Sequence, residues 1–472
     1  MMPLSEAWNI WSTRGCANNA GSKRGGGLND TSDCRIGGDR QWFSASGLDN
    51  LVDWLEECMA RHANSPAIAN PSETLSFQQI EQLSRYLAAA FRETWEVGSG
   101  GRVAVIAPPT EQLIILLAAL RAGLVCALID PSVSDAELLD ELTATEPELV
   151  VSHRQIDGIC QHMRVRPRVI RAPVGQRLAG WAHSIGFLRR RALASDELGN
   201  VIKQGRSLPF ERHEITPASL ALLGGGGYGE RLLLTHGNLL STMEQVAAAP
   251  QVAEPVGPVL AAEAVNDAVN LVLQVFLPWS VGATVVLVGG RSPQRAMAMA
   301  RRWQCRLLYA HDSTLLRWHR EGLDAQLATL SLQRWWDSPG LMTPPQRHTA
   351  FHRLAERQRW LRASHSWPVI AVEQGQSARG ARRAQMLPGT QVALASESAD
   401  PDDASGRLWI HGSQVMAGFW RSPKTTAEQI SADGWLKTGF LARMDRGGQR
   451  LRLESTDPAA ALTLQNTNNS RS

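Results

Sequence analysis

Leu222-Leu-Gly-Gly-Gly-Gly-Tyr-Gly-Glu-Arg-Leu-Leu-Leu-Thr-His-Gly-Asn238 is a glycine-rich stretch between an apolar run and the start of a helix. The run at residues 220–223 indicates a buried strand, and a helix is expected to open at Thr235. A strand, a glycine loop and a helix in succession present backbone N–H groups to phosphate. This loop, however, has no Ser or Thr between Leu222 and Tyr228, and it has no Lys. It is not a P-loop, because no Gly-Lys-[Ser/Thr] follows the glycines.

Strand-like and helix-like segments alternate on both sides of this stretch. Arg102-Val-Ala-Val-Ile-Ala-Pro-Pro109 indicates a buried strand, and a helix over residues 110–122, a cap at Gly123 and a strand over 124–129 follow it. A second unit has a strand at 284–288, a helix over 293–302 and a strand at 306–310. Strands separated by helices in this way predict an α/β protein whose parallel sheets are covered on both faces.

The glycine stretch and the Thr-His-x-Asn segment after it resemble the AMP-forming acyl-adenylate enzymes, and among these the bacterial long-chain fatty-acyl-CoA ligases. In that family the loop reads Thr-[Ser/Gly]-Gly-Thr-Thr-Gly-x-x-Lys-Gly and precedes a Leu-Thr-His-x-Asn-Leu run. Gly224 and Gly227 match the first and last loop glycines, whereas Gly225 and Gly226 replace the two threonines and Glu230 replaces the lysine. The resemblance therefore implies a nucleotide-binding loop that keeps its glycines but lacks the threonine hydroxyls and the lysine ammonium group.

A second segment carries the same resemblance. Gln414-Val-Met-Ala-Gly-Phe-Trp420, followed by Gly434-Trp-Leu-Lys-Thr-Gly-Phe440, matches the ligases' Gln-Val-Met-x-Gly-Tyr-Trp…Gly-Trp-x-x-Thr-Gly-Asp pattern. The final aspartate of that pattern binds the ribose hydroxyls of ATP in the family, and a phenyl ring at Phe440 cannot accept those hydrogen bonds. What the resemblance leaves of a cofactor-binding nucleotide site is Gly224, Gly225, Gly226, Gly227 and Thr438. We expect no catalytic residue and no metal site.

Two looser matches point the same way. The family's Gly-Tyr-Gly-x-Thr-Glu motif falls near Ser364-His-Ser-Trp-Pro-Val369, which has a ring at His365 but neither the Thr nor the carboxylate linked to Mg²⁺. The Pro-Leu-x-His segment that gates the acyl tunnel falls near Ala261-Ala-Glu-Ala-Val-Asn-Asp267, which has no histidine.

The resemblance implies the large N-terminal domain of the acyl-adenylate-forming fold, with two βαβ-built subdomains and a smaller β-rich subdomain. We expect this AMP-binding domain at residues 46–453, a disordered extension at 1–45 and a disordered tail at 454–472. The family's hinge to a small C-terminal domain corresponds here to Glu454-Ser-Thr-Asp457, and only residues 458–472 follow. A domain needs at least about 50 residues, so we expect the small C-terminal domain to be absent.

Composition excludes some partners. Lys plus Arg number 48 against 45 Asp plus Glu, a balance too even to indicate a nucleic-acid binder. Six scattered cysteines without CxxC spacing, and no apolar run long enough to span a membrane, favour the cytoplasm. The segment from Arg177 to Arg191 interleaves apolar residues with terminal arginines. It is either a helix packed on the body with a solvated end or a peripheral contact with a membrane surface.

Two functions remain after these observations. The first is a degenerate relative of the ligases without ligase activity, which acts through acyl or nucleotide binding or regulation, with fatty acid or acyl-CoA as its ligand and no required cofactor. The second is an active long-chain fatty acid–CoA ligase with atypical residues, which uses ATP and Mg²⁺ and forms acyl-AMP. A gene product with no selected function is a third. The first is favoured, because several electrostatic groups worth a few kcal/mol each are missing together.

Overall fold

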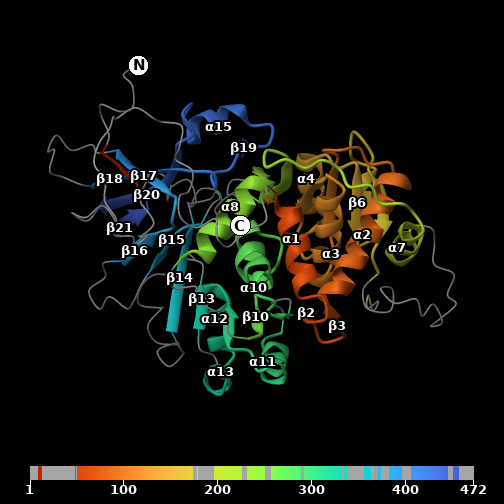
Figure 1. Ribbon diagram of the computed structural model, residues 1–472, viewed down its shortest axis with the longest axis horizontal. Helices are drawn as coiled ribbons and strands as arrows, with labels where there is room; N and C mark the ends of the chain where they lie inside the picture. The colour runs from red at the N-terminus through yellow and green to blue at the C-terminus, as the bar shows by residue number, and fades with distance from the viewer. Residues whose placement is uncertain are drawn as a thin grey trace, which may run out of the picture.

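The computed structural model describes residues 9–12, 48, 50–173, 178, 196–225, 231–249, 257–288, 292–330, 334–337, 356–362, 367, 369–373, 382–395, 405–444 and 450–456. The strands of these residues form a seven-stranded and a fourteen-stranded sheet (Figure 1). The strands from β4 to β8 of the smaller sheet pair in parallel, as do β2 and β10 to β14 of the larger sheet, and the remaining strand pairs are antiparallel. The α/β prediction is confirmed.

The seven-stranded sheet has a parallel centre. Its order is β19 (Gly418–Phe419), β9 (Arg231–Thr235), β8 (Leu220–Gly225), β5 (Val125–Leu128), β4 (Arg102–Ile106), β6 (Leu149–Ser152) and β7 (Arg168–Arg171). Every residue of β5 and β6 is buried, as expected of parallel strands covered on both faces. The antiparallel strands β9 and β19 extend one edge, so residues 418 and 419 complete a sheet that begins three hundred residues earlier in the sequence.

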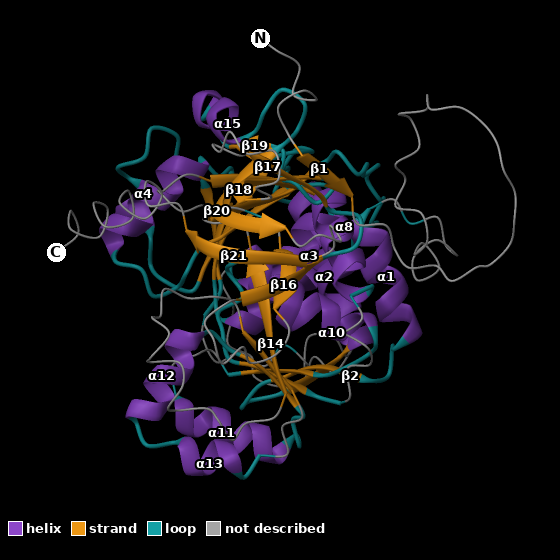
Figure 2. Cartoon of the chain, turned by 90° about the vertical axis from the view of Figure 1, so that its left-hand side faces the viewer, coloured by secondary structure: helices purple, strands orange, loops and turns teal. Residues whose placement is uncertain are grey.

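The fourteen-stranded sheet changes from parallel to antiparallel pairing at β14. Its order is β1 (Asn9–Ser12), β17 (Gln391–Ala395), β18 (Ser405–His411), β20 (Leu436–Met444), β21 (Arg450–Thr456), β16 (Arg382–Met386), β15 (Val369–Glu373), β14 (Glu356–Arg362), β13 (Arg334–Asp337), β12 (Leu307–Tyr309), β10 (Val259–Ala261), β11 (Val285–Leu287), β2 (Pro66–Ala69) and β3 (Thr74–Ser76). β14 is parallel to β13 and antiparallel to β15. The antiparallel strands lie above β14 in Figure 2, and three helices lie at the opposite end. These antiparallel strands are the β-rich part that the resemblance implies.

Fourteen helical segments cover the sheets in the described residues. They are α1 (Leu51–Arg61), α2 (Phe77–Glu93), α3 (Pro109–Arg121), α4 (Asp135–Thr145), α5 (Asp157–Cys160), α7 (Leu198–Arg206), α8 (His236–Ala247), α9 (Ala268–Leu271), the π-helix η4 (Val272–Phe276), α10 (Leu277–Ser280), α11 (Pro293–Arg302), α12 (Asp312–Arg320), α13 (Asp324–Ala328) and α15 (Pro423–Gln429). The expected helices after β4 and before β12 are confirmed as α3 and α11. Gly123 has φ +69° after α3, the left-handed conformation that ends helices.

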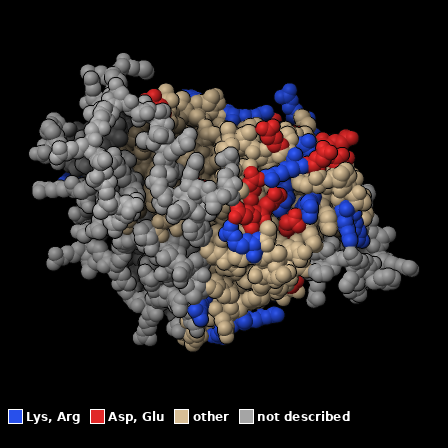
Figure 3. Space-filling view, viewed as in Figure 1, with Lys and Arg blue, Asp and Glu red and all other residues tan. Residues whose placement is uncertain are grey.

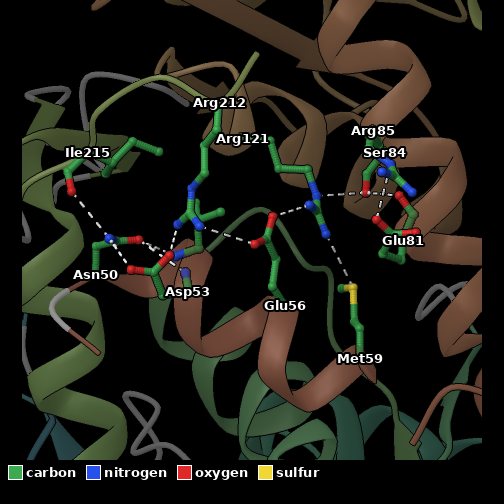
Figure 4. A network of polar contacts seen from close by, with 11 residues as sticks. Asn50, Asp53, Glu56, Met59, Glu81, Ser84, Arg85, Arg121, Arg212 and Ile215 are labelled. Atoms are coloured by element: carbon green, nitrogen blue, oxygen red, sulfur yellow. Dashed lines mark hydrogen bonds and ion pairs between the residues drawn. The ribbon is translucent and has the colours of Figure 1, made fainter. Parts of the chain in front are cut away.

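Helix α3 is buried along nearly its whole length, and its last residue is a cation. The Arg121 side chain is 4% exposed; its Nε donates to Ser84 Oγ at 3.1 Å, and its guanidinium forms an ion pair with Glu56 of α1. Figure 4 shows that Arg212 lies on the other side of Glu56, at 3.3 Å, and also pairs with Asp53. Burial lowers the pKa of the Arg121 guanidinium, and Glu56 opposes that shift. This network fixes α1, α2, α3 and the segment before β8 to one another.

The structure differs from the sequence expectation at both ends of the domain. Asn9–Ser12, inside the predicted N-terminal extension, form β1 and pair with β17, which the apolar Ile10 and Trp11 favour. At the other end, β21 runs to Thr456 rather than stopping at 453, because it pairs with β20 as far as Phe440. The rest of both terminal segments lies outside the described residues.

The charged surface has no single sign on the face seen in Figure 3, where acidic and basic side chains are interspersed over the right-hand half. None of the helices described here combines the length and apolarity needed to cross a bilayer. Four described cysteines, Cys58, Cys126, Cys160 and Cys305, are buried free thiols.

The Arg121 network leads to a prediction about stability. We expect Arg121→Met to lower the free energy of unfolding by about 3 kcal/mol. The substitution removes the buried cation that pairs with Glu56 and leaves that carboxylate with Arg212 alone. Urea unfolding measures the change. Arg61→Met, which breaks the exposed ion pair between Arg61 and Glu57 on the same helix, is the control and should cost less than about 1 kcal/mol. Equal costs for the two variants would show that Arg121 is not an organising contact.

Candidate functional site

The described end of the glycine stretch is a β-hairpin rather than a loop that leads into a helix. Gly224 and Gly225 pair with Leu232 and Arg231 across β8 and β9. The sequence expectation of strand, loop and helix is wrong here, because β9 intervenes before α8. The N-terminus of α8 therefore does not follow the glycines directly. The partial positive charge at that helix end is not brought next to them by the sequence order alone. Gly226, Gly227 and Glu230 lie outside the described residues.

Neither described glycine is required by local packing. A Cβ added at Gly225 meets nothing within 4 Å, and one added at Gly224 lies 3.4 Å from Leu234 Cδ1, an ordinary contact. The hairpin therefore has room for a side chain at both positions, including a threonine at position 225, where the family pattern has one. The glycines remain candidates for a residual nucleotide site, and the fold gives no separate reason for them.

The Thr-His-x-Asn segment caps α8, as the sequence predicts. Thr235 Oγ1 accepts from Asn238 N at 3.1 Å, and Asn238 Oδ1 accepts from Thr235 N at 3.0 Å, a reciprocal capping box. His236 is 1% exposed, and burial lowers its pKa to about 4. It is therefore uncharged at neutral pH and is placed to pack rather than to meet a phosphate.

Asn238 joins the two sequence segments that carry the family resemblance. Its Nδ2 donates to Ser413 O at 2.9 Å and to Val415 O at 2.7 Å. These carbonyls flank Gln414, which is fully buried and donates to Thr390 Oγ1 at 3.0 Å. The spacing of the motifs along the chain gave no sign of this contact, since about 175 residues separate its partners.

The cation nearest the described end of the hairpin already has a partner. Arg231 is 6% exposed and forms an ion pair with Glu141 of α4. Burial lowers its pKa to about 10, so the guanidinium stays charged at neutral pH. Its backbone carbonyl accepts from Trp420 N at 2.7 Å. Arg231 therefore ties the hairpin to α4 and to the Gln414–Trp420 run, a role that sequence reasoning missed.

Thr438 and Phe440 face the protein rather than an open site. Thr438 is fully buried, and its hydroxyl donates to Leu408 O at 2.8 Å. Phe440 is half-buried and packs against the main hydrophobic core. The position that resembles the ribose-binding aspartate thus holds an apolar side chain with an apolar neighbourhood.

Two further segments were matched to the family pattern, one near His365 and one that ends at Asp267. His365 lies outside the described residues, whereas its neighbours Trp367 and Val369 are buried. Asp267, in the segment matched to the acyl gate, accepts from Val269 N and Asn270 N and so caps α9. Within the described part of the chain, no group of three or more His, Cys, Asp or Glu side chains is arranged for a metal ion.

Comparison with known proteins supports the resemblance. Residues 55–185 match the AMP-binding enzyme family. The long-chain-fatty-acid–CoA ligase of Yersinia pestis is 24% identical over 444 residues, which cover 84% of this chain and 75% of the relative. The Haemophilus influenzae ligase is also 24% identical, over 86% of this chain and 77% of its own.

The fold is shared with solved structures. The N-terminal domain of FACL13 from Mycobacterium tuberculosis superposes with a TM-score of 0.69 at 14% identity, covering 86% of this chain and all of that domain. The large-domain fold inferred from the resemblance is therefore confirmed. The chain is thus similar to AMP-binding enzymes over residues 55–185, to bacterial long-chain-fatty-acid–CoA ligases over most of its length, and in fold to the N-terminal domain of FACL13.

Proposed function

We propose that this chain is a non-catalytic member of the superfamily that acts by binding an acyl or nucleotide ligand, or in regulation. The single observation that carries the proposal is Phe440, at the position matched to the ribose-binding aspartate. Its ring packs against the main core. Two ribose hydroxyls left unpaired there cost roughly 1–3 kcal/mol each.

The rest of the phosphate site supports the same proposal through charge. Glu230 replaces the lysine of the family loop and brings a negative charge where the pattern has a positive one. Arg231 is paired with Glu141, and His236 is neutral. Neither of these two groups is thus a free cation that could oppose the charge that develops as pyrophosphate leaves, a contribution commonly worth a few kcal/mol for each group.

Similarity to known ligases, rather than a tunnel in the described residues, is the ground for proposing an acyl ligand. The relatives from Yersinia pestis and Haemophilus influenzae are named as ligases of long-chain fatty acids. We propose a fatty acid or acyl-CoA as the ligand of this chain on that ground. The alternative, an active fatty acid–CoA ligase with atypical residues, rests on the same similarity to the ligases. An assay of ligase activity distinguishes it from the non-catalytic function.

The first functional prediction is the absence of adenylation. We expect no fatty-acid-dependent exchange between ATP and pyrophosphate and no acyl-CoA formation, because the groups that neutralise the triphosphate are missing. A bacterial long-chain ligase assayed beside it shows that the conditions support activity. Exchange above a heat-inactivated control, lost on changing Gly224 and Gly225 together to Val, would establish the active-ligase alternative.

The second prediction concerns repair of the two substituted positions. Glu230→Lys with Phe440→Asp should not give ligase turnover, because the Thr-Glu site stays unrepaired. We expect Phe440→Asp to lower the free energy of unfolding by about 3 kcal/mol, since it removes a ring from the core and adds a half-buried charge. Phe440→Leu is the matched control for stability and should cost less. Acyl-CoA synthesis by the double variant would contradict the proposal.

The third prediction concerns the membrane. The segment from Arg177 to Arg191 lies outside the described residues except for Leu178, which is 1% exposed, so membrane contact rests on its sequence. If it lies on an anionic bilayer, changing Arg189, Arg190 and Arg191 to Gln removes up to about 3 kcal/mol of binding. Co-sedimentation with phosphatidylserine vesicles should then fall by about two orders of magnitude in affinity. Equal sedimentation of the two proteins would favour a helix packed on the body.

A further inference from the structure

A serine and a histidine that are far apart in the sequence meet on the surface of the molecule. Ser99 Oγ lies 2.6 Å from His213 Nε2, across 114 residues of sequence. Ser99 lies between α2 and β4, and His213 lies between α7 and β8. Ser99 is exposed and His213 is half-buried. A hydroxyl about 2.6–3.2 Å from a basic side chain is the arrangement of an activated nucleophile, and neither residue belongs to the motifs matched to the family.

Backbone hydrogen bonds hold Ser99 at the corner of a tight turn. Gly101 N donates to Gly98 O at 2.9 Å, which closes a turn with Ser99 and Gly100 at its centre. Gly100 has φ +73°, the left-handed conformation that the third position of a type II turn requires. Its N–H donates to Gly123 O at 2.8 Å and ties the turn to the end of α3. The exposed hydroxyl of Ser99 is thus carried by an ordered backbone.

The segment that carries His213 is anchored on both sides of this residue. Arg212 forms ion pairs with two acidic residues of α1, and Ile215 O accepts from Asn50 Nδ2 at 3.2 Å (Figure 4). The ring itself packs on Gly123, because a Cβ built there would lie 2.6 Å from His213 Cδ2. A side chain at position 123 would therefore displace the ring. Gly123 ends α3 and also leaves the space that the imidazole occupies.

The hydrogen bond between the two side chains has two possible directions, and one of them activates the serine. A neutral imidazole carries its proton on one nitrogen, and its other nitrogen accepts. Because His213 is partly open to solvent, water exchanges this proton between the two nitrogens. When Nδ1 carries the proton, Nε2 accepts from the Ser99 hydroxyl and is placed to remove its proton. The alternative interpretation, a hydrogen bond that only joins two loops, predicts no special reactivity of Ser99.

We propose that Ser99 is a reactive serine that takes an acyl group from small activated esters, with His213 as its general base. Ser99 Oγ forms a bond to the carbonyl carbon of an aryl ester, the ester C–O bond breaks, and the phenolate leaves with that electron pair. The proton of Ser99 passes to His213 Nε2 and then to water, and O-acyl-Ser99 remains. The pair lies at the surface, so the rate should rise linearly with ester concentration. The proposal is independent of whether the chain adenylates a substrate.

The test measures acetylation of single serines by p-nitrophenyl acetate, on the full chain without ATP. Peptide mass spectrometry follows the acetyl group on Ser99 with time, and Ser132 is the internal reference. Ser132 is also exposed, but its Oγ donates at 2.6 Å to a carboxylate, Asp130 Oδ1, rather than to an imidazole. A general base commonly contributes about 10²–10⁴ to a rate, so we expect Ser99 to react at least about tenfold faster than Ser132. Equal rates at the two serines would overturn the proposal.

A histidine variant separates the base from the hydrogen bond. His213→Gln keeps a side chain that reaches Ser99 with an amide and removes the basic nitrogen. Acetylation of Ser99 should fall by about tenfold or more, whereas that of Ser132 should not change. His162→Gln, at an exposed histidine after α5, is the matched control and should react as the wild type does. An unchanged rate at Ser99 in His213→Gln would show that the hydrogen bond only joins the two loops.

A pair of glycine variants tests the placement of the ring. Gly123 and Gly322 have φ +69° and +75°, but a Cβ added at Gly322 meets nothing within 4 Å. Alanine at either position therefore strains the backbone alike, and only Gly123→Ala displaces His213. We expect slower acetylation of Ser99 in Gly123→Ala alone, and equal slowing in both variants would contradict this role of Gly123. Circular dichroism melts show which variants are folded; if Gly123→Ala does not fold, His213→Gln and the Ser132 reference decide.

Discussion

Burial of α3 is the constraint on which the first half of the molecule depends. The helix follows the buried strand β4, and its polar residues at both ends lie out of water along with its apolar ones. A buried cation needs a counter-charge and hydrogen bonds to its remaining donors, and Arg121 receives them from Glu56 and Ser84. At the other end of α3, Thr110 accepts from Asn70 Nδ2 at 2.9 Å. The buried polar side chains at the two ends of α3 thus need partners, and these partners help to position α1, α2 and the residue after β2.

Glu111 shows the energetic side of the same constraint. Burial raises its pKa to about 7, its own backbone N–H opposes the shift and nearby Glu73 adds to it. Because the folded pKa lies above the ordinary glutamate value of 4.5, the folded protein holds this proton over a pH range in which the unfolded chain has lost it. The contribution of Glu111 to stability is therefore largest below about pH 4.5 and is lost as the pH rises through 7. A helix that carries a carboxyl into the interior makes the fold more stable in mild acid at this one position.

Packing explains why several positions of the nucleotide motifs match the family pattern. Thr235 and Asn238 close the start of α8, Asn238 also binds the carbonyls beside Gln414, and Thr438 binds Leu408 O. Each of these polar groups is engaged within the protein, so each would be costly to lose even without a nucleotide. The positions that differ from the pattern, such as Glu230 and Phe440, are those whose family roles are directed at ATP.

The sequence was sufficient for the parts of the fold that are local. Periodicity and caps predicted α3 and α11, because each depends on residues within a few turns, as the cap at Gly123 after α3 illustrates. It was insufficient where pairing is distant or a run is short. The run Leu232-Leu-Leu234 reads as a helix or a strand with equal ease, and only its pairing with β8 and β19 makes it β9. Likewise, β1 is defined by a partner nearly four hundred residues away, at β17.

The two parallel sheets end differently at their switch points. In the first sheet, between β4 and β6, the carbonyl of Ile106 lies 2.9 Å from both the backbone N and the ring Nδ1 of His153, and Pro108 follows at once. That edge is closed by hydrogen bonds within the chain. At the second, between β10 and β12, His311 N donates to Glu263 Oε1 at 2.8 Å, whereas Gln274 Oε1 is buried with no hydrogen-bond partner among the described residues. Since a buried polar atom without a partner has an energetic cost, the chain's own hydrogen bonds satisfy the described part of the second edge less completely than the first.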